Sequence, residues 1–518
     1  MTTTLGDLVR LHGAKRPDHP YLQFEDRTDT FGYLDEVTNR LAGGLTSAGV
    51  TVGDRVALLA KNNPACFELM FAAAKCNAVF VPINWRLTAS EVATIVRDSQ
   101  AKVLVVESEF VPCLSDISSQ ESHVGTIVVL GRSNEYPSYE EWVQEFEPID
   151  TGLQAQPEDV CLQLYTSGTT GTPKGAQLTN ESLLGHMASS ATLWGYDSES
   201  VNLVVSPLFH VGGTGTALLS ILNGATTVLL REVNVEEIKR VFSAHRVTNT
   251  LLVPAIIQLL IDDPDIKAVD WSTLRTLMYG ASPISETLLR KAMNIMDCDF
   301  VQLYGITETS GCVSCLSPVD HDPVERPELL RSCGKPLPWV EVKIVDPDSL
   351  QTLPAHEAGE IWARSTQNML GYWNQSEATD AAITADGWFR TGDAGYFDDE
   401  GFLYLHDRIK DMIVSGAENI YPAEVENALM GYPGIADVGV IGVPDERWGE
   451  TPKAVVVLVE GSPATADDII AYCRTQMAGF KCPTSVDFVA ALPRNPSGKI
   501  LKRELREPYW QGRERRVG

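Results

Sequence analysis

The stretch Tyr165-Thr-Ser-Gly-Thr-Thr-Gly-Thr-Pro-Lys-Gly175 places hydroxyl residues between glycines and ends in a lysine. The apolar run Val160-Cys-Leu-Gln-Leu164 precedes it and is typical of a buried β-strand. Glycines let backbone N–H groups approach a ligand, hydroxyl groups donate hydrogen bonds, and a lysine supplies positive charge. The stretch therefore predicts a strand followed by a loop that wraps a polyphosphate. It is not a Walker A loop, because no Gly-Lys-Ser/Thr follows Gly168 at the required spacing.

Apolar strand-like runs alternate with amphipathic segments across residues 30 to 330. The expected strands span 55–60, 78–83, 201–205, 250–253, 274–279 and 299–304, and two expected helices span 67–75 and 235–245. This alternation predicts an α/β fold with parallel sheets covered by helices on both faces. Ligands of such sheets bind beyond the carboxyl ends of the strands, which is the position of Thr166, His210, Gly280 and Tyr304.

The pattern changes after residue 331. Short strand-like runs at 340–345, 359–363 and 401–405 predict an antiparallel barrel or sheet. The charged segment Asp407-Arg-Ile-Lys-Asp411 then separates two apolar runs, and we interpret it as a domain boundary rather than a hairpin turn. We therefore predict an N-terminal domain at 1–408 and an α+β C-terminal domain at 409–518.

The bulk composition limits the classes of function. The chain has 518 residues, which is more than a single hydrophobic core usually accommodates, so two or more domains are expected. Its formal net charge is −28. This acidic balance argues against nucleic-acid binding, which needs a basic surface.

Ten cysteines lie scattered without a disulfide framework, which favours buried thiols and a cytoplasmic location. Cys312-x-x-Cys315 has no second pair, so we do not expect a zinc site. No run is apolar enough to span a membrane, while peripheral membrane contact through the Arg-rich end is left open.

Two further stretches carry groups suited to a nucleotide. Gln302-Leu-Tyr-Gly-Ile-Thr-Glu308 ends a strand with a ring that could stack on a purine and a carboxylate that could bind Mg²⁺. Trp388-Phe-Arg-Thr-Gly-Asp-Ala-Gly395 puts Asp393 beside glycine, where its carboxylate could accept both ribose hydroxyl groups. Each stretch also has a simpler interpretation, because Thr-Glu is common at helix N-termini and Asp beside Gly stabilises turns.

Together these motifs resemble, in order, those of the adenylate-forming superfamily of acyl-CoA synthetases, luciferases and peptide-synthetase adenylation domains. Pro493-Arg-Asn-Pro-Ser-Gly-Lys499 extends the resemblance almost to the end of the chain. The resemblance implies a large N-terminal domain of two α/β subdomains plus a β-barrel, followed by a small α+β lid. It also implies that the lid rotates about a hinge at Lys410.

The resemblance implies roles for individual residues at the nucleotide. Tyr304 would stack on adenine, Thr307 would contact the α-phosphate, Glu308 would bind Mg²⁺, and Asp393 and Arg408 would reach the ribose. The other residues implied to hold ATP are Thr166, Ser167, Gly168, Thr169, Thr170, Lys174, Gly280, Ala281, Ser282 and Gly305. Lys499 would be catalytic, because a mobile ammonium can bridge a carboxylate and the α-phosphate while charge builds on phosphorus.

The segment Leu208-Phe-His-Val-Gly-Gly213 resembles the region beside the acyl pocket of acyl-CoA synthetases. His210 would be a gate for the acyl carboxylate, or simply a histidine at the end of a strand. Val211, Gly212, Gly213 and Gly215 would form a roomy wall, with Tyr279 and Gly305 opposite. No aspartate is present at 209–211 to hold an amino group, so the pocket suits a hydrophobic acid rather than an amino acid.

The lid carries the residues that the resemblance assigns to CoA. Ser415 and Gly416 would line a narrow channel for pantetheine, and Trp448 would touch CoA. The usual second glycine of this loop is Ala417 here, which weakens the local match.

The sequence thus predicts an ATP-dependent acyl-CoA synthetase that uses Mg²⁺ and CoA, and the overall resemblance is to actinobacterial fatty-acyl-CoA synthetases. The expected acid is a medium- or long-chain fatty acid. A ligase for an aryl, alicyclic or steroid-derived acid, or an enzyme that loads a separate carrier protein, is the alternative. A binding protein that has lost activity is disfavoured, because Glu308 and Lys499 are both present. A homodimer is left open.

Overall fold

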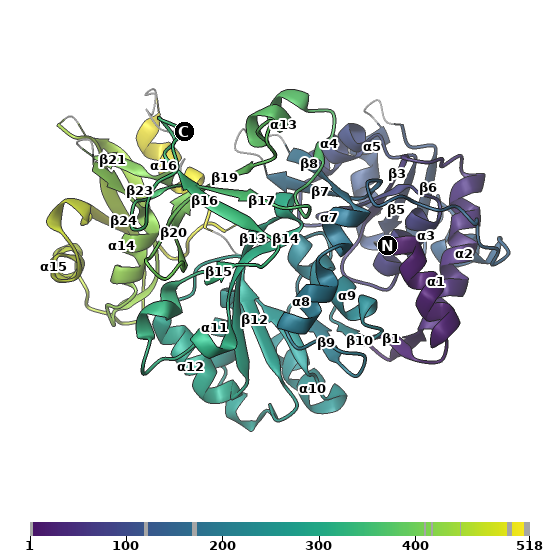
Figure 1. Ribbon diagram of the computed structural model, residues 1–518, viewed down its shortest axis with the longest axis horizontal. Coiled ribbons are helices and arrows are strands. Elements are labelled where there is room, and N and C mark those ends of the chain that lie inside the picture. Colours follow the sequence, from purple (N-terminus) through teal and green to yellow (C-terminus); the bar gives the residue numbers. More distant parts are fainter. Residues whose placement is uncertain are drawn as a thin grey trace.

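The computed structural model describes residues 4–118, 123–167, 173–408, 411–415, 418–445, 447–494 and 500–511, without the side chains of 118, 167, 407, 408, 418 and 419. The N-terminal residues form the right and lower parts of Figure 1, and the residues after 411 form a separate lobe at its left. Among the described helices, none has the length and apolarity that a membrane crossing requires.

The first of two large sheets has nine strands in the order β15-β14-β13-β12-β11-β9-β10-β1-β2. From β13 to β1 the neighbouring strands run parallel, as the sequence predicts, whereas β14, β15 and β2 are antiparallel additions at the two edges. Its strands are β1 (Pro20–Phe24), β2 (Arg27–Thr30), β9 (Val201–Val204), β10 (Thr226–Leu229), β11 (Asn249–Leu252), β12 (Thr276–Gly280), β13 (Asp299–Ile306), β14 (Gly311–Leu316) and β15 (Lys335–Pro336).

The second large sheet has seven strands in the order β18-β8-β7-β4-β3-β5-β6. The strands from β7 to β6 are parallel, and β8 turns back beside β7. Its strands are β3 (Arg55–Leu59), β4 (Val79–Ile83), β5 (Val103–Glu107), β6 (Thr126–Leu130), β7 (Val160–Ser167), β8 (Pro173–Thr179) and β18 (Gly371–Tyr372).

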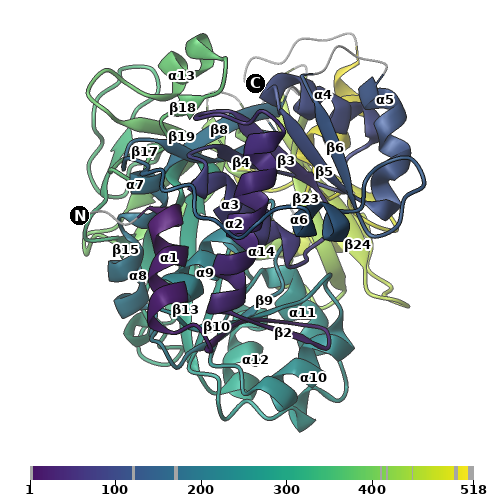
Figure 2. The ribbon, with the colours of Figure 1, turned by 90° about the vertical axis from the view of Figure 1, so that its right-hand side faces the viewer.

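Helices cover both faces of the two large sheets because their strands are apolar on both sides. The largest core cluster includes residues of the helices α1 (Leu5–Lys15), α2 (Phe31–Ser47), α3 (Ala65–Lys75) and α9 (Val211–Leu222) together with strands of both sheets. Separate clusters lie under α10 (Val235–His245), α11 (Pro254–Asp262) and α12 (Glu286–Met296) on the first sheet, and under α4 (Ala89–Ser99) and α5 (Leu114–Ser118) on the second. Figure 2 shows α1, α2 and α3 together on one flank.

The expected β-barrel subdomain is a four-stranded antiparallel sheet in the order β16-β17-β19-β20. Its strands are β16 (Glu341–Val345), β17 (Gly359–Arg364), β19 (Phe389–Phe397) and β20 (Leu403–Arg408). Other short α-helices of the N-terminal part are α6 (Tyr139–Gln144), α7 (Asn180–Leu184), α8 (Met187–Leu193) and α13 (Ser376–Ala382).

The residues after 411 form the expected α+β unit with a core of its own. Its strands are β21 (Ile413–Ser415), β22 (Glu418–Ile420), β23 (Ile435–Asp445), β24 (Gly449–Leu458) and β25 (Ser485–Phe488). Its helices are α14 (Pro422–Leu429), α15 (Ala466–Gln476) and α16 (Lys502–Trp510). The boundary predicted at 408/409 stays a prediction, and the hinge residue Lys410 lies outside the described residues.

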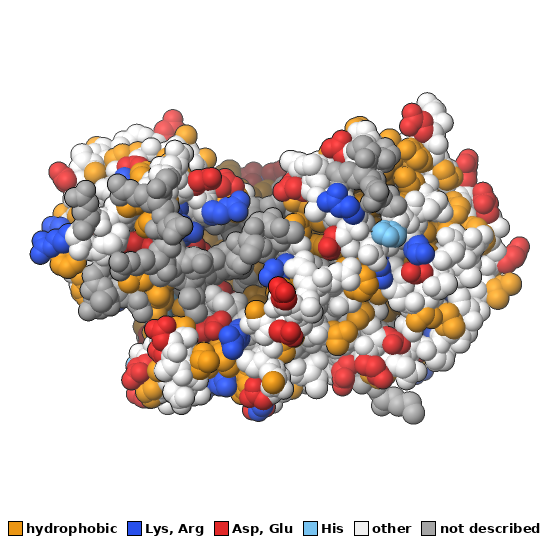
Figure 3. Space-filling model, turned by 90° about the horizontal axis from the view of Figure 1, so that it is seen from above, with side chains coloured by type: hydrophobic (Ala, Val, Ile, Leu, Met, Phe, Trp, Pro, Cys, Tyr) orange, Lys and Arg blue, Asp and Glu red, His pale blue; other side chains and the backbone are white. Residues whose placement is uncertain are grey.

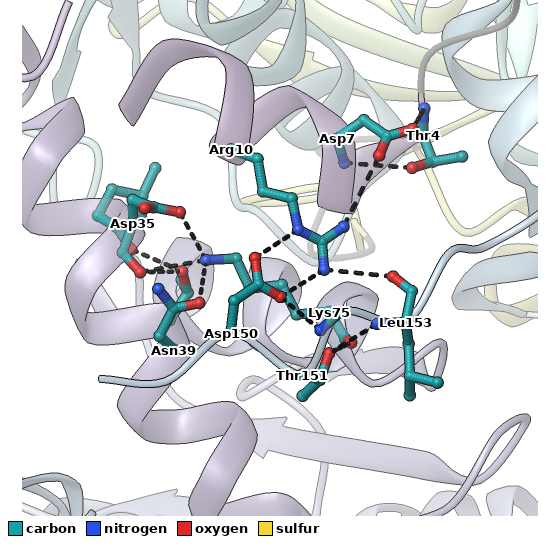
Figure 4. Close-up of polar contacts among 12 residues, drawn as sticks. Thr4, Asp7, Arg10, Asp35, Asn39, Lys75, Asp150, Thr151 and Leu153 are labelled. Carbon is teal, nitrogen blue, oxygen red and sulfur yellow. Dashed lines mark hydrogen bonds and ion pairs between the residues drawn. The ribbon is translucent and has the colours of Figure 1, made fainter. Parts of the chain in front are cut away.

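A polar network, exposed at Arg10 and Asp150 and buried at Lys75, holds the connection that leads from α6 into β7 (Figure 4). The Arg10 guanidinium donates two hydrogen bonds to the Asp150 carboxylate, at 2.6 Å from Nε and 2.8 Å from Nη2. The Thr151 hydroxyl donates to the backbone oxygen of Lys75, whose fully buried ammonium donates to Asp35 Oδ1 at 2.6 Å. This connection leads into β7, where the phosphate-loop stretch (residues 165–175) begins.

The acidic side chains are not gathered into one patch on the face shown in Figure 3. On the face shown in Figure 3, acidic side chains stand in several places, with Lys and Arg side chains among them. Exposed ion pairs of the protein include Arg364 with Glu341 at 2.8 Å and Arg326 with Glu400 at 2.8 Å.

Candidate functional site: a nucleotide and acyl cleft

The phosphate-loop stretch, residues 165–175, includes the end of β7 and the start of β8, and these two strands pair antiparallel. Thr166 of β7 lies opposite Lys174 of β8, so the base of the loop presents a hydroxyl and an ammonium from facing positions. Ser167 belongs to β7, but its side chain is not described, and Gly168, Thr169 and Thr170 lie outside the described residues. Their expected phosphate contacts stay predictions.

Glu308 joins this loop from the other large sheet. It belongs to the short 3-10 helix Thr307–Thr309 that directly follows β13, and its residue is only 9% exposed. The Thr166 hydroxyl donates to Glu308 Oε1 at 3.2 Å. Two motifs that are 142 residues apart in sequence therefore meet side chain to side chain.

A third group at this point is Tyr372, which sequence reasoning missed. Its hydroxyl donates to the same Glu308 oxygen at 3.0 Å, and the Lys174 ammonium lies 4.9 Å from the centre of its ring. Tyr372 reaches this position because β18 pairs with β8, with Tyr372 opposite Ala176. Nothing in the local sequence distinguishes it from other tyrosines, since its importance depends on that pairing.

The expected adenine and ribose residues also lie together. The Tyr304 hydroxyl donates to Asp393 Oδ2 at 2.9 Å, and the two residues are 7% and 6% exposed. Burial raises the pKa of Tyr304 well above its usual value, so the hydroxyl keeps its proton and remains a donor. Asp393 lies opposite Arg408 in the pairing of β19 with β20, although the Arg408 side chain is not described.

His210 caps the N-terminus of α9 at the expected wall of the acyl pocket. Its backbone is extended, its ring centroid lies 4.5 Å from that of Phe209, and Val211 is the first residue of the helix. A Cβ atom added at Gly212 or Gly215 would meet no atom within 4 Å, so both glycines face open space. The acyl role of this wall stays a prediction.

Gly213 is packed more closely than Gly212 and Gly215, and its expected place in the pocket wall stays a prediction. A Cβ atom at Gly213 would stand 2.4 Å from the backbone oxygen of Pro207 and 2.8 Å from that of Ser206. The position is glycine because the first turn of α9 packs against the end of the preceding loop. A side chain at Gly213 would therefore be directed at this backbone and not into open space.

Tyr279, the residue expected opposite His210, is buried in the core. The sequence places it opposite His210 on the pocket, but its residue is 1% exposed and packs in the core under α11 and α12. Its hydroxyl is hydrogen-bonded to Nε2 of His321 at 3.0 Å. Side chains alternate along a strand, so Tyr279 points to the outer face of the first sheet, while its neighbour Met278 points to the inner core.

At two positions of the site, close backbone contacts leave no room for any residue other than glycine. A Cβ atom at Gly280 would lie 2.1 Å from the Leu303 oxygen, and one at Gly305 would lie 1.8 Å from the Gly311 oxygen. After Gly280 the chain turns sharply through Ala281, whose φ of +65° is uncommon for a residue with a side chain. Ser282 follows and is partly exposed.

Two family models match the chain. A family model described as AMP-binding enzyme matches residues 9–373, and one described as AMP-binding enzyme C-terminal domain matches residues 424–499. The chain belongs to the AMP-binding enzyme family, the adenylate-forming group that its motifs resemble.

Relatives of this AMP-binding enzyme cover it almost from end to end. A fatty acid–[acyl-carrier-protein] ligase of Streptomyces coeruleorubidus is 38% identical across 99% of this chain and 98% of its own. A feruloyl-CoA synthase of an Amycolatopsis species is 40% identical across 93% and 94%. A long-chain-fatty-acid–CoA ligase of Mycobacterium tuberculosis is 36% identical across 93% of each chain.

A solved structure agrees with the fold. ATP-bound MatB from Rhodopseudomonas palustris superposes with a TM-score of 0.89 at 26% identity, across 97% of this chain and 99% of that one. The expected fold class, an α/β N-terminal domain followed by a small C-terminal domain, is thereby confirmed.

The C-terminal unit of this AMP-binding enzyme brings two of the residues expected at CoA together. Ser415 at the end of β21 pairs with Gly449, the neighbour of Trp448. The Trp448 residue is 46% exposed, and the Arg447 guanidinium lies 4.4 Å from the centre of its ring. Gly416 and the catalytic candidate Lys499 lie outside the described residues, so their roles stay predictions.

Proposed function

We propose that this protein is an AMP-forming acyl-CoA synthetase. The carboxylate of an organic acid would attack the α-phosphorus of ATP and release pyrophosphate, and the CoA thiol would then attack the acyl carbon and release AMP. One observation carries the proposal: a hydroxyl (Thr166), a carboxylate (Glu308) and an ammonium (Lys174) from separate segments converge at the phosphate-loop stretch. These groups suit an ATP triphosphate and its cation.

The residues present fit a Mg²⁺ ion that is shared with the substrate. Within the described residues, no cluster of three or more His, Cys, Asp or Glu side chains could hold a metal alone. Mg²⁺ commonly binds one or two carboxylates and completes its shell with phosphate oxygens and water, so Glu308 would suffice as the protein ligand. When bound, the ion would neutralise charge on the phosphates.

The remaining roles follow the family motifs. Lys499 would stabilise the charge that builds during adenylation, with Asp393 and Arg408 at the ribose. Rotation about Lys410 would then exchange Lys499 for a CoA channel at Ser415, Gly416 and Trp448. Such an exchange lets one cleft serve two reactions in turn.

We infer that the acid is hydrophobic, and a medium- or long-chain fatty acid is our first choice. Open space at Gly212 and Gly215 supports a roomy pocket, and two of the relatives named above are fatty-acid ligases. The feruloyl-CoA synthase, at 40% identity, supports an aryl acid as the second candidate. The carrier-protein ligase supports a carrier protein as the alternative acceptor.

Acid-dependent pyrophosphate release with MgATP tests both levels of this proposal. The panel would contain straight-chain acids from butyrate to arachidate, benzoate, a cinnamate and a steroid-derived acid, each with and without CoA. Turnover of medium or long chains that CoA accelerates is the expected result. Preference for aryl acids would favour the second candidate, release that CoA does not accelerate would favour a carrier protein, and no release with any acid would contradict the proposal.

A further inference from the structure

The two carboxylate oxygens of Glu308 have different surroundings. Oε1 accepts hydrogen bonds from the hydroxyl groups of Thr166 at 3.2 Å and Tyr372 at 3.0 Å. Within the described ranges, Oε2 receives neither a hydrogen bond nor an ion pair. One oxygen is therefore tethered, and the other is held in a fixed direction for a cation.

Lys174 lies close to the same tyrosine without an ion pair to that carboxylate. Its ammonium is 4.9 Å from the centre of the Tyr372 ring, and no ion pair joins it to Glu308 within the described residues. An ammonium over an aromatic face is attracted by the ring electrons and keeps its full charge. A direct ion pair between Lys174 and Glu308 would instead neutralise both groups.

Tyr372 is held firmly enough to act on both charges. Its backbone N–H donates to the Thr379 hydroxyl at 2.9 Å, and its strand pairs with β8. The next residue, Trp373, donates from its indole N–H to the Asp98 backbone oxygen at 2.9 Å and carries the Arg55 guanidinium 4.0 Å from its ring centre. These contacts fix the backbone from which the Tyr372 side chain extends.

We propose that Tyr372 is a positioning residue for MgATP, one that keeps two opposite charges apart and directed at the substrate. Its hydroxyl orients Glu308 toward the cation, and its ring holds Lys174 for the phosphates. This role rests on the proposed function, because it takes Glu308 and Lys174 as the groups that meet Mg²⁺ and ATP. Tyr372 itself need not touch either one.

Tyr372→Phe separates the two parts of this role, because it removes the hydroxyl and keeps the ring. The Mg²⁺ requirement is measured as the Mg²⁺ concentration that gives half of the ATP-induced rise in melting temperature. We expect this requirement to increase about three- to tenfold, because a hydrogen bond to a charged group is lost. The melting temperature without ligand should change little. This readout does not depend on knowing the acid.

Tyr372→Leu removes the ring as well, so Lys174 becomes able to pair with Glu308. We expect a larger increase in the Mg²⁺ requirement and an added increase in the ATP concentration needed for stabilisation. On a Lys174→Gln background, Tyr372→Leu should raise the Mg²⁺ requirement no more than Tyr372→Phe does, because the competing cation is gone.

Tyr33→Phe is the matched control. The Tyr33 hydroxyl also donates to a glutamate, Glu68, at 3.2 Å, but it lies in the N-terminal helix layer outside the site. The Tyr33→Phe variant should leave the Mg²⁺ requirement unchanged.

Two results would overturn the inference in different ways. An unchanged Mg²⁺ requirement in Tyr372→Phe, with normal MgATP stabilisation of the unsubstituted protein, would refute only the role of Tyr372. A protein that MgATP does not stabilise at all would refute the proposed function and this role with it.

Discussion

His186 stacks on Trp339 with 6.1 Å between the ring centroids, and burial lowers the pKa of its imidazole from 6.5 to about 4. The same physical cause acts in the opposite direction on Tyr304, where burial raises the pKa of the phenol. Burial disfavours the charged form in both cases, so both rings remain neutral at pH 7. Single residues thus acquire properties that depend on their depth in the fold.

The lowered pKa of His186 predicts a loss of stability in acid. Between pH 6.5 and pH 4 the unfolded chain binds a proton at this site and the folded chain does not, so stability falls as the pH falls through this window. His186→Gln removes this difference in proton binding between the folded and unfolded chain. At pH 4.5, relative to pH 7, the variant should lose about 2 kcal/mol less unfolding free energy than the unsubstituted protein. Urea unfolding curves at both pH values measure this, and equal losses in the two proteins would contradict it.

At the scale of elements, the first turn of α9 shows how neighbouring glycines can serve opposite purposes. Gly213 packs against the Pro207 backbone, whereas Gly212 faces open space. Helical geometry places consecutive residues about a quarter-turn apart, so adjacent glycines face different surroundings. The wall of the proposed pocket is therefore formed by one side of this helix.

Gly212→Leu should narrow the proposed acyl pocket without disturbing the nucleotide site. We expect kcat/KM for the longest accepted acid to fall by about tenfold or more relative to the shortest one, because hydrophobic pockets discriminate by volume. Stabilisation by MgATP should be unchanged. Gly213→Ala is the comparison, since its Cβ atom would clash with the Pro207 backbone and lower the melting temperature instead. Equal effects of Gly212→Leu on short and long acids would show that this space does not hold the acyl chain.

At the scale of the whole molecule, a stack of aromatic rings crosses from the N-terminal part to the C-terminal unit. Tyr396 and Tyr404 are stacked with 5.1 Å between ring centroids, and His406 of β20 stacks on Tyr421, just before α14, at 4.2 Å and 9°. Tyr421 is 8% exposed in this arrangement. The position of the C-terminal unit in Figure 1 is therefore supported by side-chain packing as well as by the chain connection.

Tyr421→Ala should loosen the C-terminal unit, because it removes one ring of the contact between the two units. We expect trypsin to cleave after Arg408 or Lys410 several-fold faster, since cleavage needs local opening of the chain. Tyr421→Phe keeps the stacked ring and should cleave at the original rate. Unchanged cleavage in Tyr421→Ala would mean that this stack does not hold the units together.

Much of the fold could be predicted because its signals are local. The helix expected at 235–245 is α10, and the strand expected at 299–304 is the main part of β13. Hydrophobic periodicity over such short windows reports burial directly. The motif resemblance likewise placed Thr166 and Glu308 at one site, and they are in contact.

What the sequence by itself determined is the order of the elements, the family and the chemical groups at the nucleotide site, because these depend on residues that are near one another in the chain. Only the tertiary structure decided that Tyr372 meets Glu308, that Tyr279 packs in the core under α11 and α12, and that Gly213 lies against the Pro207 backbone. Each of these depends on which strands pair and which face a side chain takes. A strand pairing joins residues hundreds of positions apart, and a shift of one residue reverses the face of every side chain, so neither can be deduced from a local pattern.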